Sequence, residues 1–281
     1  MAHNKPLAGK TAVVTGSGRR GGLGQAIVQR LAADGAKIVI SDIGRPADAA
    51  TPSSMIGETA EMEAIADELR VEGAEVSCFP CDVRRYADVQ ALGRHALDQH
   101  GSLDIWINNA GIGYIMKPLL EVRPEDWAAV IDVNLTGAFY GLRVAAEIMV
   151  AQGRGGRIVN IASQAAKSGF PHAQAYTASK HGLVGLVRSA AIELGPYGIT
   201  VNNVCPNHVT TGLGAWQNEY FAEVTGHDSV KSYMAAMAAR IPMRRAGLPQ
   251  DTAYAVSFLC SDHAAYVTAE SMNVSGGEEP H

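Results

Sequence analysis

Short apolar runs alternate with amphipathic helical patterns along almost the whole chain, and this alternation restricts the fold more than any other feature of the sequence. The runs at 10–15, 37–41 and 156–161 have the length and β-branched content of buried strands, whereas 174–194 has a helical period. Strands that alternate with helices form parallel sheets covered on both faces. The pattern therefore predicts a three-layer, doubly wound α/β fold, and no break in composition divides the single domain expected over 1–281.

The remaining elements follow the same alternation. We expect helices at 25–34, 58–73, 86–100, 124–152 and 249–260, and strands at 75–81, 103–108, 198–205 and 270–275. Small residues and two prolines in 44–57 favour an inserted loop. Aromatic and methionine side chains concentrate in 212–246, which indicates a helical flap over a substrate pocket.

A glycine-rich turn, Gly-Ser-Gly-Arg-Arg-Gly-Gly-Leu-Gly, links the first strand to the first helix. Glycines let a backbone approach a pyrophosphate closely, and the free N–H groups and dipole of a helix start stabilise its negative charge. In this strand–turn–helix context the segment predicts a dinucleotide phosphate site. The expected contacts are Gly16, Ser17, Arg19, Gly22, Leu23 and Gly24.

Asp42 ends the second strand, where an acid can bind both ribose hydroxyls of an adenosine. A carboxylate at that place would repel a 2′-phosphate, so we expect NAD as the cofactor rather than NADP. Arg19, Arg20 and Arg45 could each contact such a phosphate, and the NADP alternative stays open. The other cofactor contacts expected at the sheet edge are Asp82, Val83, Asn109, Ala110 and Gly111.

A serine, a tyrosine and a lysine form the candidate reaction centre. Ser163 follows the strand at 156–161, and the four-residue spacing of Tyr176 and Lys180 places them one turn apart on one helix face. A phenol has a pKa of about 10, so Tyr176 needs help to act as a base at neutral pH. We expect the Lys180 ammonium to lower that pKa. The alternative is that the Tyr-x-x-x-Lys pair only decorates an amphipathic helix.

Together these segments resemble the short-chain dehydrogenase/reductase family over about residues 7–277. The matching pieces are the glycine turn, Asp82, Asn108-Asn-Ala-Gly111, Asn134, Ser163, Tyr176-x-x-x-Lys180 and Pro206…Thr211. The resemblance implies a Rossmann-like fold and the interconversion of a secondary alcohol and a ketone. It also implies a catalytic tetrad of Asn134, Ser163, Tyr176 and Lys180.

The same resemblance implies further contacts and an assembly. Lys180 would bind the nicotinamide ribose, and Val209 and Thr211, after Pro206, would meet the carboxamide. The family also implies a homotetramer built through the long helices at 124–152 and 174–194. Asn134 would be either a plain polar residue inside a helix or the holder of a water linked to Lys180.

Two departures from the family pattern affect the site. Five residues separate Gly16 from Gly22, two more than is usual, and they include Arg19 and Arg20. The usual Pro-Gly pair is Pro206-Asn207 here. Asparagine tolerates a left-handed backbone better than most residues, so we expect that turn to persist.

The substrate is predicted only as a class. The expected pocket residues mix aromatic and polar groups: Tyr114, Gln164, Phe170, His208, Trp216 and Tyr220. This mixture favours a small or medium neutral hydroxy compound. Two alternatives remain, an NADPH-preferring carbonyl or oxoacyl reductase and a non-catalytic dinucleotide-binding regulatory protein. The complete tetrad argues against the second.

Composition narrows the partners and the compartment. A net charge of −5 and a pI of about 6.0 argue against nucleic acid or an anionic membrane as the main partner. No apolar run reaches the length of a membrane span, and the N-terminus lacks the apolar region of a signal peptide. We therefore expect a soluble cytoplasmic protein. Cys78 and Cys81 lie in a probable strand without a second ligand pair, which favours reduced thiols over a metal site.

Overall fold

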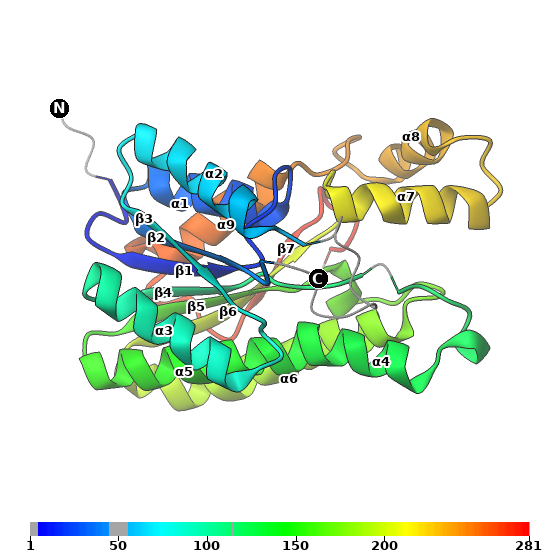
Figure 1. Cartoon of the computed structure of the whole chain (residues 1–281). Coiled ribbons are helices and arrows are strands. Elements are labelled where there is room, and N and C mark those ends of the chain that lie inside the picture. The colour runs from blue at the N-terminus through cyan, green and yellow to red at the C-terminus, as the bar shows by residue number, and fades with distance from the viewer. Residues whose placement is uncertain (1–4, 45–55, 114, 281) are drawn as a thin grey trace.

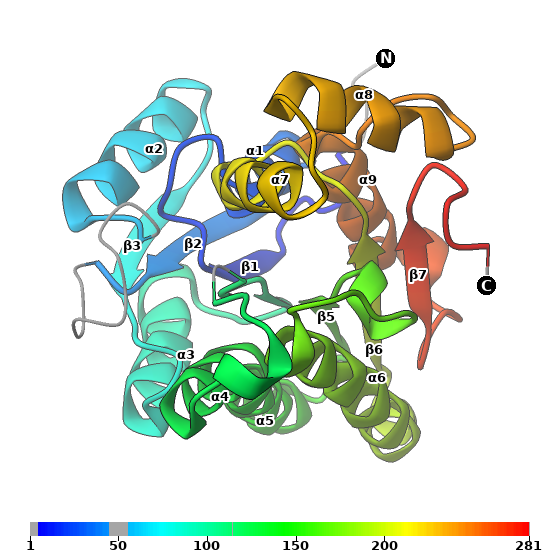
Figure 2. The same cartoon turned by 90° about the vertical axis from the view of Figure 1, so that its right-hand side faces the viewer.

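The structure is a computed structural model that describes residues 5–44, 56–113 and 115–280. Within these residues, seven parallel strands form one sheet in the order β3-β2-β1-β4-β5-β6-β7 (Figures 1 and 2). The strands are β1 (Thr11–Thr15), β2 (Lys37–Asp42), β3 (Val76–Pro80), β4 (Ile105–Asn108), β5 (Gly156–Ile161), β6 (Ile199–Pro206) and β7 (Ser271–Val274). The chain winds outward in both directions from the neighbouring strands β1 and β4, so the predicted doubly wound fold is confirmed.

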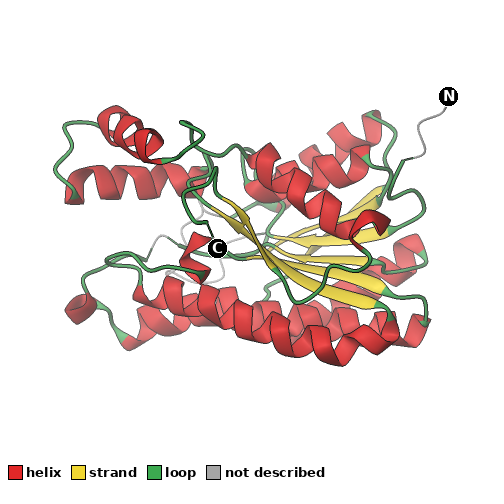
Figure 3. Cartoon of the chain, turned by 180° about the vertical axis from the view of Figure 1, so that it is seen from behind, coloured by secondary structure: helices red, strands yellow, loops and turns green. Residues whose placement is uncertain are grey.

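Helices cover both faces of the sheet and give the expected three layers (Figure 3). On one face lie α1 (Leu23–Ala33), α2 (Thr59–Val71) and α9 (Pro249–Cys260). On the other lie α3 (Tyr86–His100), α4 (Pro124–Ile131), α5 (Gly137–Gln152) and α6 (Gln174–Leu194). Two further helices, α7 (Gly212–Val224) and α8 (Val230–Arg240), form the flap, which overhangs the carboxyl edge of the sheet in Figure 2.

The strand β1 illustrates how the sheet is buried on both faces. Successive side chains of a strand point to opposite sides. Ala12 and Val14 pack in the core with α1, α2 and α9, whereas Val13 packs in the core with α3, α5 and α6. All five residues of β1 are buried, which explains why this strand is continuously apolar or small instead of alternating with charged residues.

Local sequence signals end and begin several helices. In α9, Pro249 occupies the first turn, where its missing N–H costs nothing, and the Asp251 carboxylate accepts the N–H of Leu248 at 2.8 Å. Gly101 ends α3 in a left-handed conformation with φ of 79°, which a glycine adopts without strain. The helices α3, α6 and α9 begin and end at the residues predicted for them.

The helix predicted at 124–152 contains an interruption that the sequence pattern did not reveal. A π-helical segment, Asp132–Thr136, joins α4 to α5, and Asn134 lies within it. A π segment widens the helix by one residue per turn and often accompanies a functional site. The two helices therefore form one continuous helical segment along the sheet. The π turn at Asn134 shifts which positions of the helix face the sheet before and after it.

A ladder of buried amides crosses the carboxyl half of the sheet. Trp106 Nε1 donates to Asn108 Oδ1 at 2.7 Å, Asn108 Nδ2 donates to Asn160 Oδ1 at 2.8 Å, and Asn160 Nδ2 donates to Asn203 Oδ1 at 3.1 Å. Asn203 Nδ2 continues the ladder to Ser271 Oγ at 3.0 Å. Each inner amide both donates and accepts, so these buried polar groups are satisfied while they tie β4, β5, β6 and β7 together.

The described cysteines are free thiols, as expected for Cys78 in β3 and for Cys81 directly after it. Cys81 is buried, Cys78 is half-buried, and both are free. Burial raises the pKa of each thiol to about 12, which makes both poor nucleophiles at neutral pH. Among the described residues, no helix combines the length and the apolar character that a membrane crossing requires.

Candidate active site

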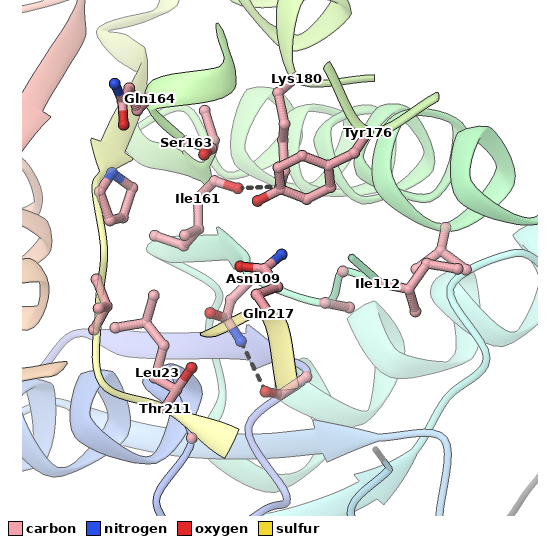
Figure 4. Close-up of a pocket in the computed structure, with 18 of the residues that line it drawn as sticks. Leu23, Asn109, Ile112, Ile161, Ser163, Gln164, Tyr176, Lys180, Thr211 and Gln217 are labelled. Atoms are coloured by element: carbon pink, nitrogen blue, oxygen red, sulfur yellow. Dashed lines mark hydrogen bonds between the residues drawn. The ribbon is translucent and has the colours of Figure 1, made fainter. Parts of the chain in front are cut away.

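A cavity of about 470 Å³ opens at the carboxyl edge of the sheet, beneath the flap (Figure 4). Its walls come from the segments that follow β1 to β6 and from α6, α7 and α8. Except for Ser17 and Asn134, all the predicted cofactor and catalytic residues line this cavity. Gln164, Phe170 and His208 of the predicted substrate set line it as well.

The glycine turn brings the start of α1 to the cavity. Gly22 precedes α1 and provides no side-chain cap, so no side chain caps the first N–H groups of the helix. A Cβ on Gly24 would lie 2.3 Å from the carbonyl oxygen of Gly16, and a Cβ on Gly16 would lie 2.6 Å from Ala110 Cα. These two glycines therefore let α1 and the segment after β4 approach the turn closely. The open helix start fits a pyrophosphate.

Ser17 does not line the cavity, and its contact with a cofactor stays a prediction. Its side chain is fully buried, donates to the carbonyl oxygen of Val14 at 2.7 Å and accepts from the N–H of Ser41 at 3.2 Å. The hydroxyl thus joins β1 to β2 under the turn.

Asp42 lines the cavity at the end of β2 and also organises the turn. Its Oδ2 accepts the N–H of Gly18 at 3.1 Å, and its Oδ1 accepts the N–H of Ile43 at 2.9 Å. Burial raises the pKa of Asp42, and these backbone hydrogen bonds oppose the rise. The carboxylate therefore combines the turn-forming role that any acid could play with a position facing the cavity.

The candidate phosphate-binding arginines separate into two groups. Arg19 lines the cavity, and its charge acts to lower the pKa of Asp42. Arg20 does not line it, because its Nη2 pairs with Glu68 Oε1 on α2 at 2.6 Å. Arg45 lies outside the described residues. Sequence reasoning missed Arg84, which also lines the cavity. Its Nη2 lies 2.8 Å from the Oδ2 of Asp82. Its position two residues after Asp82, a predicted cofactor contact, was the signal that could have found it.

Ser163, Tyr176 and Lys180 gather where β5 meets α6 (Figure 4). Ser163 follows the strand with an extended backbone, and its side chain hydrogen-bonds with that of Tyr176. Lys180 is 5% exposed, and its Nζ donates to the carbonyl oxygen of Ile161 at 2.8 Å. The same Nζ lies 5.6 Å from the centre of the Tyr176 ring. A hydroxyl, a phenol and an ammonium therefore surround one end of the cavity.

The electrostatics of this group differ from the expectation. Burial raises the pKa of Tyr176, and the hydrogen bond with Ser163 acts against the rise. Burial also lowers the pKa of Lys180 from 10.5 to about 8. In this structure desolvation of the phenol sets the direction of the Tyr176 shift and the Lys180 ammonium is directed at the Ile161 carbonyl, so the lowering of the Tyr176 pKa by Lys180 stays a prediction.

Asn134 lies behind the cavity wall rather than in it. The residue is 2% exposed, its Oδ1 accepts the N–H of Ile112 at 2.8 Å, and its Nδ2 donates to the carbonyl oxygen of Ile112 at 2.9 Å. The Nδ2 also donates to Ser179 Oγ at 3.2 Å. The amide therefore clamps the segment after β4 to the π turn and to α6. This arrangement is a positioning contact, and the link from Asn134 through a water to Lys180 stays a prediction.

The flap presents a different face to the cavity from the one predicted. Trp216 and Tyr220 do not line the cavity; the Tyr220 hydroxyl bonds to His172 Nδ1 at 2.8 Å, and the Trp216 ring stacks on Tyr220 with centres 5.6 Å apart. The structure therefore does not bring these two side chains to the cavity, because α7 turns this face toward the loop of His172, and their substrate contacts stay a prediction. Tyr114 lies outside the described residues. The residues of α7 that line the cavity are Gln217, Asn218 and Phe221.

The turn after β6 persists, but its left-handed residue is His208 rather than Asn207. The φ of His208 is 45°, and Asn207 instead donates its Nδ2 to the Glu278 carboxylate at 2.5 Å. Glu278, Tyr233 and Arg240 line the same end of the cavity, and sequence reasoning missed all three. No local motif marks them, since the fold brings them together from the flap and from the C-terminal segment.

Metal ligands are not a feature of this site. Across residues 5–44, 56–113 and 115–280, no group of three or more His, Cys, Asp or Glu side chains is arranged to hold a metal ion. The cavity instead combines the N-terminus of α1, the Asp42 carboxylate and the Tyr176 phenol.

Comparison with known proteins identifies a family over nearly the whole chain. The family described as Enoyl-(Acyl carrier protein) reductase matches residues 16–279. A short-chain dehydrogenase/reductase of Armillaria gallica is 34% identical over 279 residues, which cover 99% of this chain and 98% of that protein. An L-2,3-butanediol dehydrogenase of Corynebacterium glutamicum is 35% identical over 271 residues, covering 95% and 98%.

The fold agrees with these relatives. The crystal structure of a carveol dehydrogenase from Mycobacterium avium in complex with NAD aligns with a TM-score of 0.89 at 31% sequence identity. The alignment covers 97% of this chain and 98% of that one. Fold and sequence therefore point to one family.

Proposed function

The chain belongs to the short-chain dehydrogenase/reductase family of oxidoreductases, and we propose that it interconverts a secondary alcohol and a ketone with NAD as the cofactor. The observation that carries this proposal is the meeting of Ser163, Tyr176 and Lys180 in one cavity with the open N-terminus of α1. The relative from Corynebacterium glutamicum is named for the oxidation of a secondary alcohol, which supports the reaction class.

The chain's own residues suit a dinucleotide along the cavity. The N–H groups at the start of α1 would hold the pyrophosphate, Asp42 the adenosine ribose, and Asp82 and Val83 the adenine. Lys180 would hold the nicotinamide ribose, and the residues after β6, namely Pro206, Val209 and Thr211, would hold the carboxamide. Bound there, the dinucleotide would supply the acceptor or donor of the hydride.

The side chains of Ser163, Tyr176 and Lys180 would carry out the proton transfer. Ser163 Oγ would hold the substrate oxygen by a hydrogen bond and stabilise its partial charge. Tyr176 Oη would take the alcohol proton during oxidation and return it during reduction. A raised pKa keeps Tyr176 protonated at neutral pH, which favours reduction there, whereas higher pH favours oxidation. Lys180, whose pKa is about 8, can exchange protons with solvent close to neutral pH.

Replacement of Tyr176 by phenylalanine tests the reaction. We expect Tyr176→Phe to lower kcat by about 10²–10⁴-fold, because the proton donor is removed while the ring remains. Binding of NADH, followed by its fluorescence, should stay within about threefold of the parent, since the phenol is not a phosphate contact. Turnover within a few-fold of the parent would reject the role of Tyr176 and with it the mechanism.

The cofactor preference is a separate proposal. Asp42 would repel a 2′-phosphate, and Arg20 is held by Glu68, so NAD is favoured. We expect the parent to use NAD with a higher kcat/KM than NADP. Asp42→Ala should lower the ratio of the kcat/KM with NAD to that with NADP. Arg20→Gln serves as the control, because Arg20 does not line the cavity and should leave the ratio unchanged. Preference of the parent for NADP would contradict the assignment.

One observation keeps a second function in consideration. Arg19 lines the cavity near Asp42, where its guanidinium would suit the 2′-phosphate of NADPH, as in a carbonyl or oxoacyl reductase. Arg19→Gln distinguishes the two, since only an NADPH-dependent enzyme would lose most of its activity. A non-catalytic regulatory protein would turn over no alcohol or ketone with either cofactor.

We further propose a homotetramer in the cytoplasm. Exposed apolar side chains on α4, α5 and α6, namely Trp127, Phe139 and Ile192, support an interface on that face. The free thiols of all four cysteines are typical of a reducing compartment. Light scattering after size-exclusion chromatography tests the assembly, and a mass near one chain would refute it.

A further inference from the structure

A cluster of polar side chains from three separate elements lines the cavity around the carboxylate of Glu278. Glu278 comes from the segment after β7, His208 from the turn after β6, and Tyr233 and Arg240 from α8 of the flap. We name Glu278, His208 and Arg240 the distal polar site. We propose that this site binds a second hydroxyl group of the substrate, so that the enzyme acts on diols or polyols in preference to simple alcohols. The inference rests on the function proposed above.

The C-terminal segment is fixed beside the reaction centre. Gln164, which directly follows Ser163, donates its Nε2 to Glu279 Oε1 at 3.0 Å. Asn207 holds the neighbouring Glu278 carboxylate at 2.5 Å. Because the segment is anchored at both places, the distal polar site lies on the same wall of the cavity as Ser163 rather than on the phosphate side. A substrate held at Ser163 can therefore extend toward Glu278.

The contacts within the site leave hydrogen-bonding capacity. His208 Nε2 lies 3.5 Å from Glu278 Oε2, and Arg240 Nε lies 3.7 Å from Glu278 Oε1. Charge-assisted hydrogen bonds are shorter, at about 2.7–2.9 Å, and a carboxylate offers about four acceptor positions. A polar contact longer than about 3.5 Å can be completed by an oxygen placed between the groups. The site thus presents an acceptor and two donors to the cavity.

A hydroxyl group matches this combination better than other substituents. It can donate to the carboxylate and accept from the guanidinium or the imidazole through a single oxygen. An alkyl group would desolvate the carboxylate without replacing its partner, which is costly. A carboxylate or phosphate would face Glu278 directly, and the charge of Arg240 is already balanced by that acid. Burial lowers the pKa of His208, so the imidazole adds no positive charge at neutral pH.

Paired substrates test the inference. The kcat/KM values for 2-butanol and 2,3-butanediol, and for cyclohexanol and 1,2-cyclohexanediol, would be measured with NAD and with NADP. We expect the parent to prefer the diols by about tenfold or more, the discrimination typical of a hydrogen bond to a charged group. Glu278→Gln should lower kcat/KM for the diols about tenfold more than for the monoalcohols. Glu219→Gln, which removes an exposed acid of α7, is the matched control and should leave both values unchanged.

Arg240→Gln provides a second variant from the flap side, where the arginine side chain is 64% exposed and its removal does not threaten folding. It should reduce the preference for diols in the same direction. Equal activity of the parent on diols and monoalcohols, or equal losses on both in the two variants, would overturn the inference while leaving the proposed function intact. A preference for 3-hydroxybutyrate that Arg240→Gln removes would overturn it in favour of an anion site. Failure of the parent to oxidise any alcohol or reduce any ketone would instead reject the proposed function itself.

Discussion

Lys180 carries a buried ammonium whose cost should be visible in the stability of the protein. Burial lowers the pKa of Lys180 from 10.5 to about 8, and at about 1.4 kcal/mol per pKa unit this difference corresponds to about 3 kcal/mol. The sign follows from proton linkage. Folding removes a proton from this group between the two pKa values, so the penalty is complete below pH 8 and disappears as the pH rises toward 10.5.

The substitution Lys180→Met removes this titration while it keeps much of the side-chain volume. At pH 7 the variant escapes the desolvation penalty but leaves the Ile161 carbonyl oxygen without its ammonium partner, which costs about 1–3 kcal/mol. These two effects nearly cancel in a single measurement. The pH trend separates them, because only the parent regains stability on titration. Between pH 7 and pH 10 the parent should gain about 2.5 kcal/mol relative to the variant.

Urea unfolding at several pH values and at one protein concentration measures the difference in unfolding free energy. All other titrating groups are common to both proteins and cancel to first order. The exposed Lys231→Met on α8 is the control, and its effect should be small and independent of pH because its side chain stays in water. A parent–Lys180→Met difference that remains constant from pH 7 to pH 10 would refute the claim that the ammonium is desolvated.

Two further substitutions test the framework around the site. Asn160→Ala removes the centre of the amide ladder and leaves a buried donor and a buried acceptor without partners. We expect the free energy of unfolding to fall by about 2–4 kcal/mol. A loss below about 1 kcal/mol would mean that the ladder contributes little. Gly24→Ala would place a Cβ 2.3 Å from the Gly16 carbonyl oxygen, so it should destabilise the chain by about 1–3 kcal/mol and raise the KM for the dinucleotide by about tenfold as α1 is displaced. Gly195→Ala, whose Cβ would meet nothing within 4 Å, is the control for both the stability and the KM measurement. Equal changes in stability and KM for the two glycine variants would contradict the packing argument.

Local sequence patterns predicted most of the fold and the position of the reaction centre. Strand-length apolar runs and helical periods reflect backbone geometry and burial, which act over a few residues. The helix α6 was therefore delimited from the sequence, and with it the common face of Tyr176 and Lys180. Residues that follow strands, such as Asp42 and Ser163, come to one edge because parallel strands all end there.

The predicted site residues that the structure does not bring to the cavity are held elsewhere by contacts with distant segments. Ser17 lies in the predicted turn, yet its hydroxyl forms hydrogen bonds with backbone groups of β1 and β2. Trp216 and Tyr220 lie on the predicted flap, but the docking of α7 turns them toward His172. Periodicity shows that a helix has an apolar face without showing what that face will meet.

The sequence by itself determined the α/β architecture, the glycine turn, and the residue types that can hold a dinucleotide and move a proton, because these depend on neighbouring residues. Only the tertiary structure decided the directions in which the pKa values of Tyr176 and Lys180 shift, since burial is a property of the assembled fold. It also decided that Glu278 lines the cavity. Its contact with Asn207 joins positions 71 residues apart, and nothing local to either residue specifies that meeting.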